Sequence, residues 1–190
     1  IAMAMNSTAE LDDGKTIGNP TEAALLLWLR VQGTDKTKLR QGDRIVWQLP
    51  FSTEHKYMAT IADMEGKRLL FVKGAPEIVM AHCNLTAEEQ KDIQRQLFDY
   101  QNKAMRTLAF AYKELPDTVA ECRLKEGDNN LTLQAIAAIS DPLREEVPGA
   151  VMECQSAGID VKIVTGDTSA TAIEIARQIG IWTDRLPDGA

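Results

Sequence analysis

The stretch Phe71-Val72-Lys73-Gly74-Ala75-Pro76-Glu77 determines how we interpret the rest of this 190-residue chain. Its apolar residues favour a β-strand that ends at Lys73, and the two small residues that follow leave room for a ligand. We expect a helix to begin at Pro76, because the N–H that proline lacks is not used at the first helical position. These residues fit a ligand-facing lysine, and they equally fit a solvated lysine before an ordinary turn.

The overall composition is that of a soluble globular protein, with 44% hydrophobic and 26% charged residues. No apolar run approaches the roughly 20 residues that span a bilayer, and we see no signal-peptide pattern at the start. A net charge of −7 without a basic cluster argues against nucleic acid as a partner. The three cysteines are far apart, so the sequence predicts neither a disulfide framework nor a metal site.

The first two thirds of the chain predict a mixture of strands and helices. One helix begins at Pro20 after an Asn19 N-cap, with Glu22 placed for a capping box, and ends at Gly33. A second, long helix follows Thr86, whose capping-box partner is Glu89. The predicted strands cover residues 44–49, 57–62, 67–72 and 107–112, with a hairpin turn at 63–66 and a short helix near 117–124.

Several polar or aromatic residues at the ends of these elements could have either of two roles. Phe51 and Lys56 could stack on a base and attract its phosphates, or they could be a core residue and a solvated lysine. Glu22 could bind a ligand or cap its own helix, and Arg106 could contact a phosphate or lie on the surface.

The last third of the chain has the pattern of an α/β protein. It predicts a strand at 131–139 buried on both faces, a helix at 145–157, a short strand at 160–164 and a helix at 168–179. The right-handed crossover rule makes the two strands of such a βαβα unit parallel. A ligand would then approach the carboxyl ends of the strands, near Asp141 and residues 165–167.

Six short motifs, taken in order, resemble the cytoplasmic signature of P-type ATPases, most closely the calcium-pump-like P2 group. They are Gly18-Asn19-Pro20-Thr21-Glu22, Pro50-Phe51-Ser52 with Lys56 and Met58, Lys73-Gly74-Ala75-Pro76-Glu77, Met105-Arg106-Thr107-Leu108-Ala109, Asp141-Pro142-Leu143-Arg144 and Val164-Thr165-Gly166-Asp167. The resemblance covers almost the whole chain. It implies an α+β nucleotide-binding domain over residues 1–140, an antiparallel sheet flanked by helices. A partial phosphorylation domain of haloacid-dehalogenase-like α/β fold would follow over residues 141–190.

The resemblance also implies the roles of individual residues. Phe51 would stack on adenine, with Glu22 in polar contacts around the base. The remaining residues line the pocket or meet the phosphates: Lys73 on the floor, Gly74 and Ala75 allowing close approach, Lys56, Arg106 and Leu108 toward the ribose and phosphates, and Thr165, Gly166 and Asp167 at the phosphate end of ATP.

The sequence departs from the family pattern at several points. Thr53 stands where the calcium pump of muscle has an arginine, so Lys56 and Arg106 would carry more of the phosphate contacts. Asp35-Lys36-Thr37 continues as Lys38-Leu39-Arg40, so it is not the phosphorylated Asp-Lys-Thr-Gly-Thr motif. The magnesium-binding Gly-Asp-Gly-x-Asn-Asp motif is also missing. We therefore expect no catalytic residue and no metal ligand in this chain.

We interpret the chain as a piece of a larger cation pump, on the cytoplasmic side of a membrane. It would hold ATP without hydrolysing it, while the whole enzyme uses ATP and Mg²⁺ to phosphorylate an aspartate outside this chain. Its partners would be the rest of the phosphorylation domain, the actuator domain and the membrane helices. Two alternatives remain: a freestanding phosphatase of the haloacid-dehalogenase type, and a non-catalytic nucleotide-binding module.

Overall fold

The computed structural model describes most of the chain in two compact units. The described residues are 1–12, 15–34, 36–40, 44–103, 105–125, 127, 130–140, 143–165 and 169–182, except the side chains of residues 170 and 171. The first unit comprises Ile1–Lys91 and Thr107–Ile139, and the second comprises Asp92–Arg106 and Ser140–Ala190.

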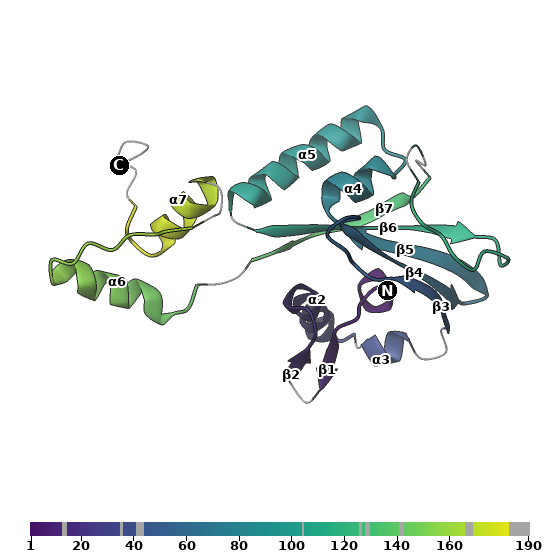
Figure 1. The fold of residues 1–190 in the computed structure, drawn as a ribbon, viewed down its shortest axis with the longest axis horizontal. Coiled ribbons are helices and arrows are strands. Elements are labelled where there is room, and N and C mark those ends of the chain that lie inside the picture. The colour runs from purple at the N-terminus through teal and green to yellow at the C-terminus, as the bar shows by residue number, and fades with distance from the viewer. Residues whose placement is uncertain are drawn as a thin grey trace. The chain divides into compact units, whose positions relative to one another are not determined.

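The helices and strands alternate irregularly along the chain (Figure 1). The helices are α1 (Ala2–Met5), α2 (Pro20–Val31), α3 (Lys36–Leu39), α4 (Pro76–Ala81), α5 (Ala87–Asn102), α6 (Glu146–Ser156) and α7 (Ser169–Gln178). The strands are β1 (Glu10–Asp12), β2 (Lys15–Ile17), β3 (Arg44–Leu49), β4 (Tyr57–Met64), β5 (Lys67–Gly74), β6 (Arg106–Leu115) and β7 (Thr132–Ile139). None of the described helices is long and apolar enough to cross a bilayer.

A five-stranded sheet in the order β3-β4-β5-β6-β7 forms the centre of the first unit, beside a small β1-β2 hairpin. The pairs β3–β4, β4–β5 and β5–β6 are antiparallel. Glu65 and Gly66 join β4 to β5 with positive φ angles of 49° and 77°, the geometry that suits a tight hairpin. The predicted hairpin is therefore confirmed, with a shorter turn, because Met64 already pairs with Lys67.

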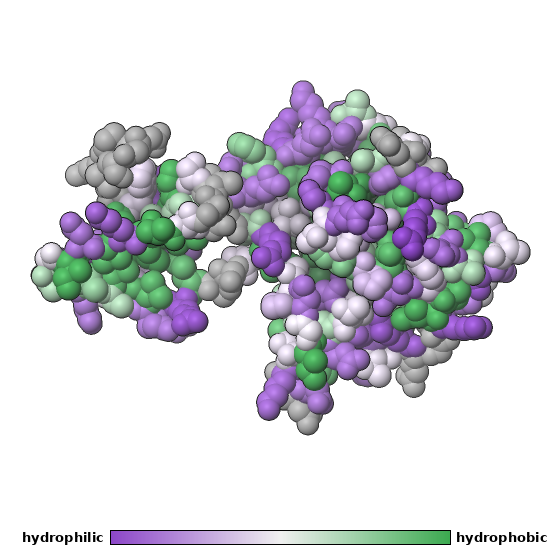
Figure 2. Space-filling model, viewed as in Figure 1, coloured by the Kyte–Doolittle hydropathy of each residue, from purple (hydrophilic) through white to green (hydrophobic). Residues whose placement is uncertain are grey.

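Both faces of the central strands are buried, because alternate side chains enter two separate apolar clusters. On one face Ile61 and Val72 pack with Val79 of α4 and with Leu131. On the other face Phe71 and Phe110 pack with Met5 of α1 and Leu25 of α2. Figure 1 shows α4 and the N-terminal helices on opposite sides of this sheet. The face of this unit that Figure 2 shows carries many hydrophilic residues, with smaller hydrophobic areas between them.

Three helices of the first two thirds confirm the sequence-based boundaries closely. Asn19 caps α2, where its side-chain oxygen accepts a hydrogen bond from the backbone N–H of Thr21 at 2.8 Å. Thr86 and Glu89 form the predicted capping box of α5, with hydrogen bonds of 2.8 to 3.2 Å in both directions. α4 begins at Pro76, as the opening stretch predicts.

The predicted short helix near residues 117–124 is wrong. This segment is irregular, and its apolar residues Val119, Cys122 and Leu124 pack against the sheet cluster. Two polar contacts hold it there: Arg68 donates to the carbonyl oxygen of Val119, and the backbone N–H of Leu124 donates to the Tyr57 hydroxyl. An extended segment reaches these partners along the sheet, and a helix of the same residues would be shorter.

The predicted βαβα unit is only partly present. α6 and α7 confirm its two helices, whereas residues 160–164 form no strand. A strand requires a neighbour for its backbone hydrogen bonds, and no described segment pairs with these residues. The other predicted strand is present as β7, an outer strand of the five-stranded sheet. None of the residues of β7 is buried, so the predicted burial of this strand on both faces is wrong.

Candidate functional site

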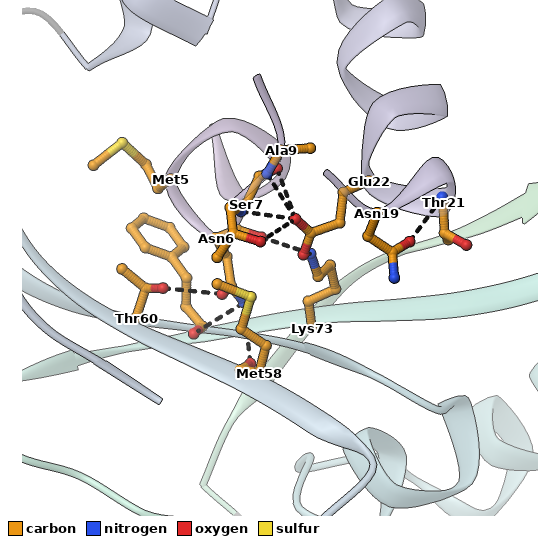
Figure 3. Close-up of polar contacts among 12 residues, drawn as sticks. Met5, Asn6, Ser7, Ala9, Asn19, Thr21, Glu22, Met58, Thr60 and Lys73 are labelled. Carbon is orange, nitrogen blue, oxygen red and sulfur yellow. Dashed lines mark hydrogen bonds and ion pairs between the residues drawn. The ribbon is translucent and has the colours of Figure 1, made fainter. Parts of the chain in front are cut away.

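A buried ion pair joins α2 to the end of β5 (Figure 3). The ammonium of Lys73 donates to the Glu22 carboxylate over 2.6 Å, and only 4% of Lys73 and 7% of Glu22 are exposed. Lys73 reaches this position because β5 turns it, with Phe71, toward α1 and α2. Two opposite charges that are buried away from water require additional hydrogen bonds to be stable.

Those hydrogen bonds come from residues 6–9, which we call the strap. The second carboxylate oxygen of Glu22 accepts from the backbone N–H groups of Thr8 at 2.7 Å and Ala9 at 2.9 Å. The hydroxyl groups of Thr8 and Ser7 donate to the same oxygen at 2.9 and 3.3 Å. Lys73 also donates to the carbonyl oxygen of Asn6 at 2.8 Å.

Asn6 fastens the strap to the sheet and is fully buried. Its side-chain NH₂ donates to the carbonyl oxygens of Met58 at 3.1 Å and Phe71 at 3.4 Å, and its side-chain oxygen accepts from the Thr60 hydroxyl at 2.9 Å. One asparagine therefore satisfies groups of both β4 and β5 (Figure 3).

Burial and pairing act against each other on the two charges. Burial alone would raise the pKa of Glu22, but the hydrogen bond and charge of Lys73, with the bonds from Thr8, lower it to about 2. Burial lowers the pKa of Lys73, and Glu22 only partly offsets this. The dense set of donors around Glu22 keeps its carboxylate ionised at neutral pH.

The predicted capping box at Glu22 is wrong, because its carboxylate binds the strap and Lys73 and both of its oxygens are occupied there. Glu22 was interpreted from its spacing to Asn19, and that local pattern gives no sign of the strap donors Ser7, Thr8 and Ala9, which lie 13 to 15 positions earlier in the chain. The helix keeps its N-cap from Asn19 alone.

Phe51 and Lys56 lie in the loop between β3 and β4, and both are exposed. Phe51 is 54% exposed, so it does not belong to the core. Lys56 has a φ of 57°, the left-handed conformation that is uncommon outside glycine. Its N–H donates to the carbonyl oxygen of Ser52 at 2.8 Å, and its own carbonyl oxygen accepts from the N–H of Ala75 at 3.0 Å.

Gly74 packs against the backbone of this loop. A Cβ at Gly74 would lie 2.5 Å from the carbonyl oxygen of Lys56 and 2.7 Å from the Cβ of Tyr57, closer than real Cβ atoms approach. The close approach of β4 therefore explains the glycine without a ligand. It also brings Lys56 beside Gly74 and Ala75, immediately after Lys73 in the chain.

The other predicted site residues are more scattered. Leu108 is half-buried on the same sheet face as Phe110. Arg106, the first residue of β6, and Thr165 are exposed and belong to the second unit. Gly166, Asp167, Asp141 and Pro142 lie outside the described residues.

The sequence analysis missed the strap and its contacts with Glu22 and Lys73. The polar run Asn6-Ser7-Thr8 between apolar neighbours was the available signal, but it has no spacing that points to a partner so far along the chain. In the part of the chain that the structure describes, no group of three or more His, Cys, Asp or Glu side chains could hold a metal ion.

Comparison with known proteins points to one family. The model of the P-type ATPase cytoplasmic domain N matches residues 1–146. Calcium-transporting ATPase 1 of Lactococcus lactis is 34% identical over 189 residues, which is 94% of this chain and 21% of the relative. Calcium-transporting ATPase PAT1 of Dictyostelium discoideum is 37% identical over 198 residues, 96% of this chain and 18% of the relative.

A plant relative matches the chain with similar identity and coverage. The plasma membrane-type Calcium-transporting ATPase 4 of Arabidopsis thaliana is 36% identical over 186 residues, which cover 90% of this chain and 18% of the relative. The chain thus spans about a fifth of the length of the curated relatives that it matches.

Proposed function

Because this chain belongs to the P-type ATPases and contains their cytoplasmic N domain, we propose that it binds ATP around Phe51, Lys56 and the end of β5. The observation that carries the proposal is that one loop holds both the exposed ring of Phe51 and the exposed ammonium of Lys56. The backbone of this loop is hydrogen-bonded to Ala75, the residue after Gly74. Aromatic rings and cations together suit a base with a phosphate tail.

The roles proposed for the residues come from the family resemblance, and the exposure and charge of Phe51 and Lys56 support them. Phe51 stacks on the adenine ring, and Lys56 and Arg106 meet the phosphates, with Leu108 beside them. Glu22 and Lys73 neutralise each other, so they shape the floor of the site and contribute little net charge to phosphate binding. Gly74 and Ala75 keep the loop close to this floor.

We further propose that the protein acts as part of a cation pump, with calcium as its ion. In that enzyme, ATP held here loses its γ-phosphoryl group, with Mg²⁺, to an aspartate outside this chain, and this chain alone forms no phosphoenzyme. Residues 1–140 constitute the N domain, and residues 141–190 belong to a phosphorylation domain of haloacid-dehalogenase-like fold on the cytoplasmic side of a membrane. Thr165, Gly166 and Asp167 then meet the phosphate end of ATP. The unit boundary at Ile139 and the names of the relatives support this assignment.

Titration of the 190-residue chain with ATP, followed by calorimetry and by NMR chemical shifts, tests the proposal. We expect Phe51→Ala to weaken ATP binding about tenfold, because a stacked base contributes about 1 to 3 kcal/mol. Phe98→Ala is the matched control, since Phe98 is 62% exposed on α5 and has no part in the proposed site. Absence of saturable binding, or an equal effect of the two substitutions, would overturn the proposal.

A further inference from the structure

Two cations, one in α3 and one directly after it, donate hydrogen bonds to carbonyl oxygens of α1 and the strap. Arg40 directly follows α3, and its guanidinium donates to the carbonyl oxygens of Ala4 at 3.0 Å and of Met5 and Ser7 at 2.9 Å. Lys36, the first residue of α3, donates to the carbonyl oxygen of Ala9 at 2.6 Å. These cations therefore tie α3 to the segment that contacts Glu22.

The contact at Ser7 is the most direct of these. The carbonyl of Ser7 and the N–H of Thr8 belong to one peptide group, so Arg40 binds its oxygen while Glu22 binds its hydrogen. A cation on the oxygen polarises the peptide and strengthens the N–H as a donor. Lys36 acts at the following peptide group: the carbonyl oxygen of Ala9 accepts from Lys36, while the N–H of Ala9, in the preceding peptide group, donates to Glu22.

Beyond Asn6, which is held by β4, β5 and Lys73, the strap has few other contacts that fix its conformation. Residues 6–9 have no regular secondary structure, and the preceding α1 has four residues, far fewer than a helix needs to be stable alone. The groups of the strap that contact Glu22 are therefore held by side chains from other elements. The negative charge of Glu22 also acts on both cations, partly offsetting the burial that lowers the pKa values of Lys36 and Arg40.

We propose that Arg40 and Lys36 are positioning residues of the nucleotide site, which hold the strap peptides so that their N–H groups orient Glu22 toward Lys73. The inference rests on the proposed ATP function, and it assigns a role to Lys36 within the Asp35-Lys36-Thr37 run that the sequence analysis set aside. Neither cation need touch ATP for its loss to weaken binding.

The test compares Arg40→Met and Lys36→Met with Lys38→Met in the 190-residue chain. Lys38 is exposed on the same short helix, and its side chain makes no hydrogen bond or ion pair with the residues that the structure describes, so its substitution removes one cation without disturbing the strap. The first readout is the amide proton shifts of Thr8 and Ala9, which hydrogen bonds to a carboxylate move downfield. The second is the ATP dissociation constant.

We expect the Thr8 and Ala9 signals to move upfield and ATP affinity to fall about three- to tenfold in both test variants, the range typical of lost orientation of one polar group. Lys38→Met should leave both readouts unchanged. If Arg40→Met does not fold, Arg40→Lys serves instead, because lysine keeps the charge but cannot reach three carbonyls. Lys36→Arg should restore the Ala9 signal.

The two readouts separate the failure of this inference from the failure of the proposed function. If the unaltered chain does not bind ATP, the proposed function fails, while the amide shifts still decide whether Arg40 and Lys36 orient the strap. If ATP binds normally and the test variants match Lys38→Met in both readouts, the positioning role is overturned and the ATP site stands.

Discussion

The candidate site has an inner and an outer half that differ in nearly every physical respect. The inner half consists of Glu22, Lys73 and the strap, where the charges are buried and each donor meets an acceptor. The outer half is the loop with Phe51 and Lys56, where the side chains are exposed. The inner half therefore belongs to the structural framework, whereas the outer half has exposed side chains that can meet a ligand.

This difference follows from the cost of removing charge from water. A buried ion pair is stable only when further hydrogen bonds satisfy its remaining lone pairs and protons, and here the strap supplies them. Among the described residues, no buried side-chain nitrogen or oxygen is left without a partner. Breaking one contact of the inner half should therefore cost far more than removing a whole side chain of the outer half.

The largest expected effect comes from removing the charge of Lys73. Lys73→Met leaves the Glu22 carboxylate buried without its cation, and we expect the free energy of unfolding in urea to fall by about 3 to 5 kcal/mol. Adding Glu22→Gln should recover part of that loss, since no buried charge then remains, with a coupling of about 1 to 3 kcal/mol between the two positions. Strict additivity would show that the two charges do not depend on each other.

Lys67→Met is the matched control, on the same strand. Lys67 pairs with Glu114 at 2.8 Å, close to the Lys73–Glu22 distance, but both side chains are more than half exposed. An exposed pair contributes little because water replaces it readily. A large loss of stability in Lys67→Met would remove burial as the explanation of the difference between these two ion pairs.

Acid should lower the stability of the folded chain, because Glu22 in the inner half becomes protonated. Its pKa is about 2 in the folded chain, below the ordinary value of 4.5, so the unfolded chain takes up this proton first as the pH falls. The ionised Glu22 carboxylate contributes about 3 kcal/mol to the free energy of unfolding. This contribution is present in full above pH 4.5 and decreases between pH 4.5 and 2.

Urea unfolding at pH 6 and pH 3 measures this contribution. Glu22→Gln has no proton to gain at this position, so its stability should fall less between the two pH values than that of the unaltered chain. An identical fall in both would mean that other carboxylates account for the acid sensitivity and that the pKa of Glu22 is ordinary.

Much of the fold could be predicted from local pattern. The run from Phe71 to Pro76 correctly indicated a strand followed directly by a helix, because apolar residues and a proline at the first helical position act over a few residues. Residues 131–139 were correctly predicted as a strand, yet their burial was not, since an apolar run does not reveal whether a strand is central or outer.

The candidate site was less predictable, because its inner half depends on contacts between distant segments. Glu22 and Lys73 are 51 positions apart, and they meet because α1, α2 and β5 pack into one apolar cluster. Gly74 was correctly singled out as small, but the reason appears only in the pairing of β5 with β4. The nucleotide contacts of Phe51 and Lys56 came from family resemblance and stay predictions.

The smallest expected effect is in the outer half, at the strained backbone of Lys56. Lys56→Gly and Lys56→Ala both remove the ammonium, so ATP affinity should fall equally in the two. Only glycine adopts a φ of 57° without steric cost, so Lys56→Gly should be more stable than Lys56→Ala in urea by about 1 kcal/mol. Equal stabilities would mean that the loop relaxes when the side chain is shortened. Unequal ATP affinities would show that the backbone at Lys56, as well as its charge, contributes to nucleotide binding, and the outer half would then require the same preorganisation as the inner one.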